Sequence, residues 1–292
     1  MTIAACYVSP EGVVLGADST MTYSLGGAAH YFDHGQKIFE VGKRDSTLGM
    51  VLWGLGSVSG GISHRTLIAE LGDSLTQIPP VTVQEAANRW CDIFWSLYEK
   101  EFADQIKRSD ELTAKSQRTV DEQSELAEMD RLTVGFCLGG WCAPDRTPAA
   151  SVMTFSTYLK QNGPVALPIN NWGFWGAPNL LLRVIRGADP DLIADIMKSG
   201  KWTGTQAELD ALVQSHNLGH PILPLREAID FVHASIYTVI KAMKFSEKQQ
   251  ICGGPVELAV ITTDRPFRWV RHKRMDEALG HGQPRGGSWP AR

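Results

Sequence analysis

The sequence predicts an α+β protein in which helices pack outside antiparallel sheets. Runs rich in β-branched and aromatic residues, separated by turn residues, occur near both ends of the chain and in its middle. Between these runs lie stretches with the 3.6-residue apolar spacing of amphipathic helices. The strands come in groups and do not alternate one by one with helices, which disfavours a doubly wound parallel sheet.

The first part of the chain is predicted to form four strands. Residues 2–8 and 13–19 flank a turn that contains Pro and Gly, so they are expected to pair as a hairpin. A glycine-rich and polar loop is expected over 24–35. Two further strands are predicted in QKIFEV (36–41) and in TLGMVLWGLGS (47–57), the latter ending in glycines.

Two helices are predicted next, followed by a charged segment. Apolar residues recur at helical spacing over 62–78 and stop at a Pro-Pro pair. Thr82 and Glu85 form a capping-box pattern at the start of the second helix. Residues 99–131 carry ten acidic and six basic residues. We interpret this segment as a solvated helical insertion, with a partner-binding surface as the alternative.

The rest of the chain is predicted to continue in strands, helices and strands. The strands are expected at 131–141, 149–157, near 170–176, at 255–264 and at 267–273. The helices are expected at 179–186, 190–199, 206–216 and 225–244. Since neither a repeat nor an internal linker is evident, residues 1–273 are predicted to form a single domain. Residues 274–292 are expected to be a flexible tail.

Composition narrows the classes of partner. The 292 residues carry a formal net charge of −4, so the chain lacks the basic excess typical of nucleic-acid or anionic-membrane binding. It contains no apolar run of 18 residues. Five scattered cysteines, without a signal-peptide pattern, favour packed thiols in the cytoplasm. No metal or other cofactor is expected, because the cysteines and the pair His216 and His220 lack a metal-site pattern.

Two charged residues fall within apolar strands close to the chain start. Asp18 ends the second predicted strand, and Lys37 shares the alternating face of Phe39 and Val41. A lysine placed against a core is costly unless an opposite charge meets it. Pairing across the first hairpin brings Asp18 close to Thr2. We therefore expect a hydroxyl, a carboxylate and an ammonium in one site, although an Asp-Lys pair in strands also serves a purely structural role in many proteins.

This set of groups has a chemical use once Met1 is removed. A free α-amino group has a pKa of about 7.7 to 8.0, so a fraction is neutral near pH 7 and accepts a proton from a hydroxyl. Thr2 would then act as nucleophile and base together. An ammonium at Lys37 would depress the pKa of that amine, while Asp18 would hold the lysine in place.

The turn WGLGSVSGG leads from a strand into a helix and completes the candidate site. Its backbone N–H groups could receive a developing oxyanion, although simple packing geometry is the alternative interpretation. The turn has neither a Walker lysine nor a dinucleotide-binding fingerprint, so phosphate binding is disfavoured. The chain also lacks a G-x-S-x-G elbow, which leaves a serine hydrolase of that fold without support.

These residues resemble the β-type subunits of the proteasome and its bacterial relatives, within the N-terminal nucleophile (Ntn) hydrolases. The resemblance is carried by TIAA, EGVVLGADST, QKIFEV, the glycine turn and GGPVELAVITTD. The bacterial homologues called Anbu and BPH look like the closer relatives, since they also begin at Met-Thr without a long propeptide. The resemblance implies a four-layer α-β-β-α sandwich, assembly of identical chains into a ring, and hydrolysis of peptide bonds.

The resemblance also assigns residues. It implies Thr2 as nucleophile, Asp18 as its acidic partner and Lys37 as the lysine. Thr22 would pair with substrate backbone. The pocket would be lined by Met21, Gly35 and Trp53, and the oxyanion site would lie at Gly54, Leu55, Gly56 and Ser57.

Some family positions are altered in this chain. The supporting serine is replaced within 173–176, and the late aspartate and serine fall near Gln249 and Cys252. The predicted function is a self-assembling threonine peptidase acting on peptides or unfolded proteins, with the ATPase or unfoldase partner left open. A weakly active or inactive ring-forming scaffold and an Ntn amidase for a small molecule are the alternatives.

Overall fold

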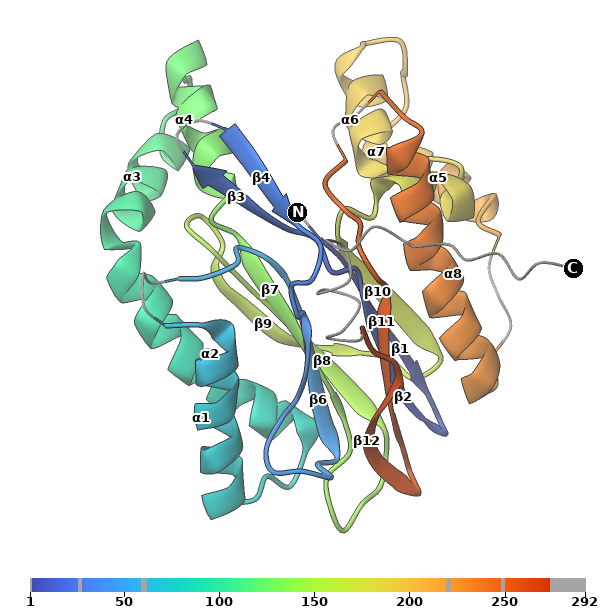
Figure 1. Cartoon of the computed structure of the whole chain (residues 1–292). Helices are drawn as coiled ribbons and strands as arrows, with labels where there is room; N and C mark the ends of the chain where they lie inside the picture. The colour runs from blue at the N-terminus through green and yellow to red at the C-terminus, as the bar shows by residue number, and fades with distance from the viewer. Residues whose placement is uncertain (1, 26–27, 59–61, 219–221, 248–249, 274–292) are drawn as a thin grey trace, which may run out of the picture.

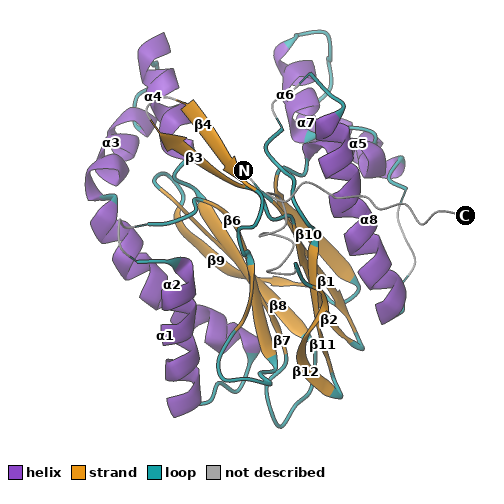
Figure 2. Cartoon of the chain, viewed as in Figure 1, coloured by secondary structure: helices purple, strands orange, loops and turns teal. Residues whose placement is uncertain are grey.

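A computed structural model describes residues 2–25, 28–58, 62–218, 222–247 and 250–273. Two five-stranded antiparallel sheets form its centre (Figures 1 and 2). In order across it, the first sheet contains β10 (Asn171–Gly176), β1 (Ile3–Ser9), β2 (Gly12–Ala17), β11 (Glu257–Thr262) and β12 (Arg265–Arg271). The second contains β5 (Ile38–Glu40), β6 (Leu48–Gly54), β7 (Val134–Gly140), β8 (Ala149–Ser156) and β9 (Lys160–Leu167).

The helices lie in two groups on opposite sides of the sheets (Figure 1). The group beside the second sheet is α1 (His64–Gln77), α2 (Val83–Glu101), α3 (Ala103–Thr113) and α4 (Val120–Asp130). The group beside the first sheet is α5 (Asn179–Arg186), α6 (Pro190–Lys198), α7 (Gln206–Ser215) and α8 (Leu225–Lys244). Helices outside two antiparallel sheets are the architecture that the sequence predicts.

Three apolar clusters hold these elements together. Trp90 and Phe94 of α2 pack on Phe136 and other side chains of the second sheet. A second cluster, which includes Leu15 and Val51, fills the space between the two sheets. A third lies between the first sheet and α8. Strands β1 and β2 are buried along their whole lengths because both faces of their sheet are covered.

One strand pair and one edge strand differ from the sequence-based expectation. Strands β3 (Met21–Leu25) and β4 (Ala28–Phe32) form a separate two-stranded sheet where a loop was expected. Strand β9 was also missed, because Gly163 and Pro164 and its polar residues break the usual pattern. As an edge strand it tolerates a proline, whose missing N–H is not needed by a second neighbour.

The charged segment 99–131 is helical, as expected. It contains the end of α2 and all of α3 and α4. Arg108 of α3 donates two hydrogen bonds of 2.8 Å each to the carboxylate of Glu125 on α4. Thr119 and Glu122 cap α4 reciprocally. Paired charges and caps therefore account for the helical form of this segment.

None of the helices in the described part of the chain is both long and apolar enough to cross a bilayer. The expected flexible tail, 274–292, lies outside the described residues.

Candidate active site

The hairpin of β1 and β2 brings the first residues and Asp18 to the same end of the sheet. Ala4 pairs with Ala17, and the Asp18 amide donates to the Ile3 carbonyl at 3.1 Å. Thr2 therefore lies just before β1 where Asp18 lies just after β2. Thr2 is 4% exposed and Asp18 is fully buried.

The Asp18 carboxylate accepts four hydrogen bonds. Its Oδ1 accepts from the Ile3 amide at 3.1 Å and from the Lys37 ammonium at 2.6 Å. Its Oδ2 accepts from the amides of Thr20 at 3.2 Å and Gly253 at 3.0 Å. A buried charge of this kind is tolerated only when it is paired and hydrogen-bonded, and this carboxylate meets both conditions.

Lys37 lies just before β5 and is 2% exposed. Its carbonyl accepts from the Leu52 amide at 3.0 Å, which fixes its backbone against β6. Its ammonium and the amide that follows Thr2 bond to the same carboxylate oxygen. The expected ion pair of Asp18 and Lys37 is therefore present at the end of the first hairpin, next to Thr2.

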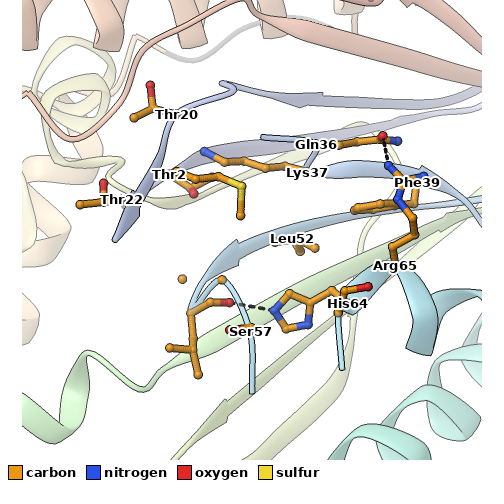
Figure 3. Close-up of a pocket in the computed structure, with 15 residues that line it drawn as sticks. Thr2, Thr20, Thr22, Gln36, Lys37, Phe39, Leu52, Ser57, His64 and Arg65 are labelled. Carbon is orange, nitrogen blue, oxygen red and sulfur yellow. Dashed lines mark hydrogen bonds between the residues drawn. The ribbon is translucent and has the colours of Figure 1, made fainter. Parts of the chain in front are cut away.

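Thr2 and Lys37 open onto a cavity of about 430 Å³. The rest of its described lining comes from within residues 20–22, 36–39, 52–57 and 63–65. Figure 3 shows Thr2 and Lys37 at one side of the cavity, with His64 and Arg65 at the other. A threonine hydroxyl and an ammonium thus share one concave site, which is the usual setting of an enzyme pocket.

Most of the expected binding residues line this cavity. They are Met21, Thr22, Gly54, Leu55, Gly56 and Ser57. Gly35 lies behind Met21: a Cβ added at Gly35 would come within 2.1 Å of the Met21 side chain. Gly35 thus shapes the cavity through Met21, and it is not itself part of the described lining.

The expectation that Trp53 lines the cavity is wrong for this structure. The Trp53 side chain lies between the two sheets and stacks on Trp175, with ring centroids 4.7 Å apart. Because successive side chains of a strand point to opposite faces, Leu52 faces the helix side and lines the cavity while Trp53 faces the other sheet.

The turn at 54–57 has a backbone that requires glycine. Gly54 has φ of +86°, and an added Cβ would lie 2.2 Å from the Thr133 carbonyl oxygen. The Leu55 amide donates to that same carbonyl at 2.9 Å, so it is already used. Among the described residues, no hydrogen-bond partner is found for the amides of Gly56 and Ser57. Within the described ranges, these two amides are the available donors of the turn.

A second glycine sets the position of Thr2. Gly176, at the end of β10, pairs with Ile3 and has φ of +87°. A Cβ on Gly176 would lie 1.9 Å from the Thr2 carbonyl oxygen. The segment 173–176, where the resemblance places the replaced supporting serine, is therefore part of the strand that packs against Thr2.

Residues 252–255, which precede β11, pack against Asp18 and Ser19. The Gly253 amide bonds to Asp18, and the Ser19 hydroxyl donates to the Pro255 carbonyl at 2.6 Å. Cys252 is fully buried, and burial followed by the charge of Asp18 raises the pKa of its thiol to about 12. It is therefore a packed thiol and not a nucleophile. Gln249 lies outside the described residues.

All five cysteines are free and buried, as expected for packed thiols. His216 ends α7, whereas His220 lies outside the described residues. Within the described ranges, no three metal-ligating side chains come together.

His64 is a cavity residue that the sequence analysis missed. It is the first residue of α1, after the N-cap Ser63, and it is 5% exposed. Its Nε2 lies 2.9 Å from the Leu55 carbonyl oxygen, so an Nε2–H tautomer donates to the turn at 54–57. Phe94 and Phe136 pack on the ring. Its place at a helix start directly after the glycine turn was the available signal.

The burial of His64 predicts a dependence of stability on pH. Burial lowers the pKa of this imidazole below 6.5, although the bond to Leu55 opposes the shift. The unfolded chain therefore binds a proton that the folded chain resists. The free energy of unfolding should be highest above pH 6.5 and fall as pH drops from 6.5 toward the lowered pKa.

Thermal unfolding of the natural chain and of His64→Gln, measured between pH 8 and pH 5, checks this. The glutamine keeps a donor for Leu55 and does not titrate. We expect the Tm of the natural chain to drop more steeply below pH 6.5 than that of the variant. Parallel curves would contradict the assignment.

Comparison with known proteins relates this fold to one class. No family model matches the sequence. No curated protein matches it either. Among solved structures, Anbu (ancestral beta-subunit) from Yersinia bercovieri matches with a TM-score of 0.50 and 10% identity, over 96% of this chain and 91% of that chain. A Gly-1 mutant of Anbu from Hyphomicrobium sp. strain MC1 matches with a TM-score of 0.48 and 11% identity, over 94% and 87%.

At 10% identity the likeness to the Yersinia protein shows the fold alone. The fold is similar to that of Anbu, which is described as an ancestral beta-subunit. The sequence motifs predict this likeness.

Proposed function

We propose that this chain is a threonine-type Ntn hydrolase that cleaves peptide bonds, with Thr2 as nucleophile once Met1 is removed. The observation that carries the proposal is the buried ion pair of Lys37 and Asp18, 2.6 Å long, beside Thr2 in the cavity. Buried ion pairs occur both at reaction sites and in structural networks, and the Thr2 hydroxyl on the same cavity as Lys37 favours a reaction site here.

The reaction begins at the Thr2 hydroxyl. Its oxygen attacks the carbonyl carbon of the scissile bond, and the free α-amine of the same residue accepts the hydroxyl proton. The ammonium of Lys37 favours the neutral amine and stabilises negative charge that develops on the oxygen. Asp18 takes no part in the proton transfer and orients the Lys37 side chain through their hydrogen bond.

The turn at 54–57 is proposed to bind the oxyanion of the tetrahedral intermediate. Among the described residues, the amides of Gly56 and Ser57 are available as hydrogen-bond donors. The Leu55 amide already donates to the Thr133 carbonyl. When the tetrahedral intermediate collapses, the C–N bond breaks and the protonated α-amine returns its proton to the leaving amine. Water then hydrolyses the ester on Thr2 and regenerates the hydroxyl.

The proposal extends to the assembly of the chain. The helices outside each sheet support a four-layer α-β-β-α arrangement. The structural relative from Yersinia is described as a beta-subunit, which supports a homo-oligomeric ring for this chain as well. Peptides or unfolded proteins are the proposed substrates, in the cytoplasm and without a cofactor. An unfoldase partner is not assigned.

Intact mass spectrometry of the purified chain tests the proposal. We expect the mass to lack Met1, and treatment with a peptide epoxyketone to add one full reagent mass. Peptide mapping should place the adduct on Thr2. A chain that retains Met1, or that carries the adduct at another residue, would contradict the proposal.

A further inference from the structure

The charges around the cavity are unbalanced. Two cationic side chains, Lys37 and Arg65, belong to the described lining, and none of the described lining residues is acidic. Lys37 is neutralised by Asp18, which is buried behind it. Arg65 is therefore the cation of the described lining that has no carboxylate partner.

Arg65 meets only neutral groups among its described partners. Its Nη2 donates to the amide oxygen of Gln36, and its guanidinium lies over the Phe39 ring, 5.2 Å from the centroid (Figure 3). A guanidinium has five N–H donors, so most of them remain available. Arg65 is an exposed residue and belongs to the lining of the cavity.

The N-terminus of α1 adds to the positive potential at Arg65. Arg65 belongs to the first turn of α1, where the helix dipole favours an anion and where α1 has no acidic residue. The carboxylate of Glu257 is fully buried and lies 3.0 Å from the Lys273 ammonium and 2.7 Å from the His272 ring. Burial lowers the pKa of Lys273, the contacts with Glu257 oppose this, and the charges of Lys37 and Arg65 lower it further. The charges of Lys37 and Arg65 thus both act on Lys273.

The cavity also offers apolar contact. Phe39, Leu52 and Leu55 line it together with Met21. A side chain with a short aliphatic stem and a terminal carboxylate matches this combination of apolar walls and one uncompensated guanidinium. A lysine or arginine in the same place would meet like charge without an acidic partner.

We propose that the cavity selects an acidic side chain, glutamate or aspartate, on the residue whose carbonyl carbon Thr2 attacks, with Arg65 as the specificity-determining residue. This inference rests on the proposed peptidase function and names its substrate class. On binding, the carboxylate replaces the neutral amide of Gln36 as the partner of Arg65. The exchange is favourable because hydrogen bonds between two ionised groups are stronger than bonds to a neutral acceptor.

Four fluorogenic peptides that differ only in the residue before the scissile bond test this proposal. That residue is Glu, Gln, Leu or Lys, and Gln is the uncharged isostere of Glu. We expect kcat/KM for the Glu peptide to exceed that for the Gln peptide about tenfold, in line with a charged hydrogen bond in a partly solvated site. Higher ionic strength should reduce the ratio.

Three variants make the test specific to the cavity. In Arg65→Gln the Glu-to-Gln ratio should fall to within about twofold, and in Arg65→Glu the Lys peptide should overtake the Glu peptide. Arg226→Gln, which changes an exposed arginine of α8, is the matched control and should keep the natural ratio. Thermal melts confirm that each variant is folded.

The outcomes separate this inference from the proposed function. Equal cleavage of the Glu and Gln peptides, or a Glu preference that survives in Arg65→Gln, would overturn the role of Arg65 while peptidase activity stands. Cleavage of none of the four peptides, together with no epoxyketone adduct on Thr2, would overturn both.

Discussion

Thr2→Ala is expected to lose peptide hydrolysis and epoxyketone labelling, by about 10⁴-fold or more. Alanine at this position keeps the α-amine but has no hydroxyl to attack the carbonyl, and removal of a nucleophile has effects of this size in hydrolases. The change deletes few atoms from a residue that is already buried, so the fold and the Tm should stay close to those of the natural chain.

Thr2→Ser is the matched control for this prediction. It keeps a hydroxyl on the residue after Met1 and should retain labelling at a reduced rate, within about tenfold. Initial rates with a fluorogenic peptide and intact mass after epoxyketone treatment are the two measurements. Full labelling of Thr2→Ala would show that another side chain is the nucleophile.

Lys37→Met is expected to abolish labelling and also to destabilise the fold. The substitution removes the ammonium that favours the neutral α-amine, and it leaves the buried carboxylate of Asp18 without its charged partner. Breaking a buried ion pair on one side costs about 3–5 kcal/mol. Three backbone amides still donate to Asp18 and reduce this loss of stability, but they do not neutralise the charge of its carboxylate.

A double variant separates catalysis from stability. Lys37→Met with Asp18→Asn removes both charges, so it should be more stable than Lys37→Met alone and equally inactive. Lys43→Met, which changes an exposed lysine in the loop after β5, should match the natural chain in both respects. Denaturant unfolding gives the stabilities and epoxyketone labelling gives the activities. Recovery of labelling in the double variant would contradict a chemical role for Lys37.

The proximity of Asp18 and Lys37 was predictable from the sequence because it depends on local rules. A Pro- and Gly-containing turn sets the register of the first hairpin, and alternation places Lys37 on an apolar face. A lysine buried in this way requires a carboxylate. The strand groups and the long helices were predictable for the same reason, since each is encoded in a short window of residues.

The parts that were missed depend on information outside such windows. Whether Leu52 or Trp53 faces the cavity depends on which face of β6 is covered by helices, which the strand itself does not encode. His64 acquires its role by reaching the Leu55 carbonyl across a turn. The β3–β4 pair did carry a local signal, because Gly26-Gly27 separates two runs of five residues, but the glycines were interpreted as a loop.

The full set of hydrogen bonds to Asp18 forms only after residues far along the chain have been synthesised. Strand β2 pairs with β11, and one of the four donors to Asp18 is the Gly253 amide. Both partners are synthesised more than 230 residues after Asp18, as the sequence separation of 235 between Asp18 and Gly253 shows. While the chain is still emerging from the ribosome, neither the central strand nor the carboxylate has its full set of partners. The site can therefore be fully organised only after the segment that contains Gly253 and β11 has been synthesised.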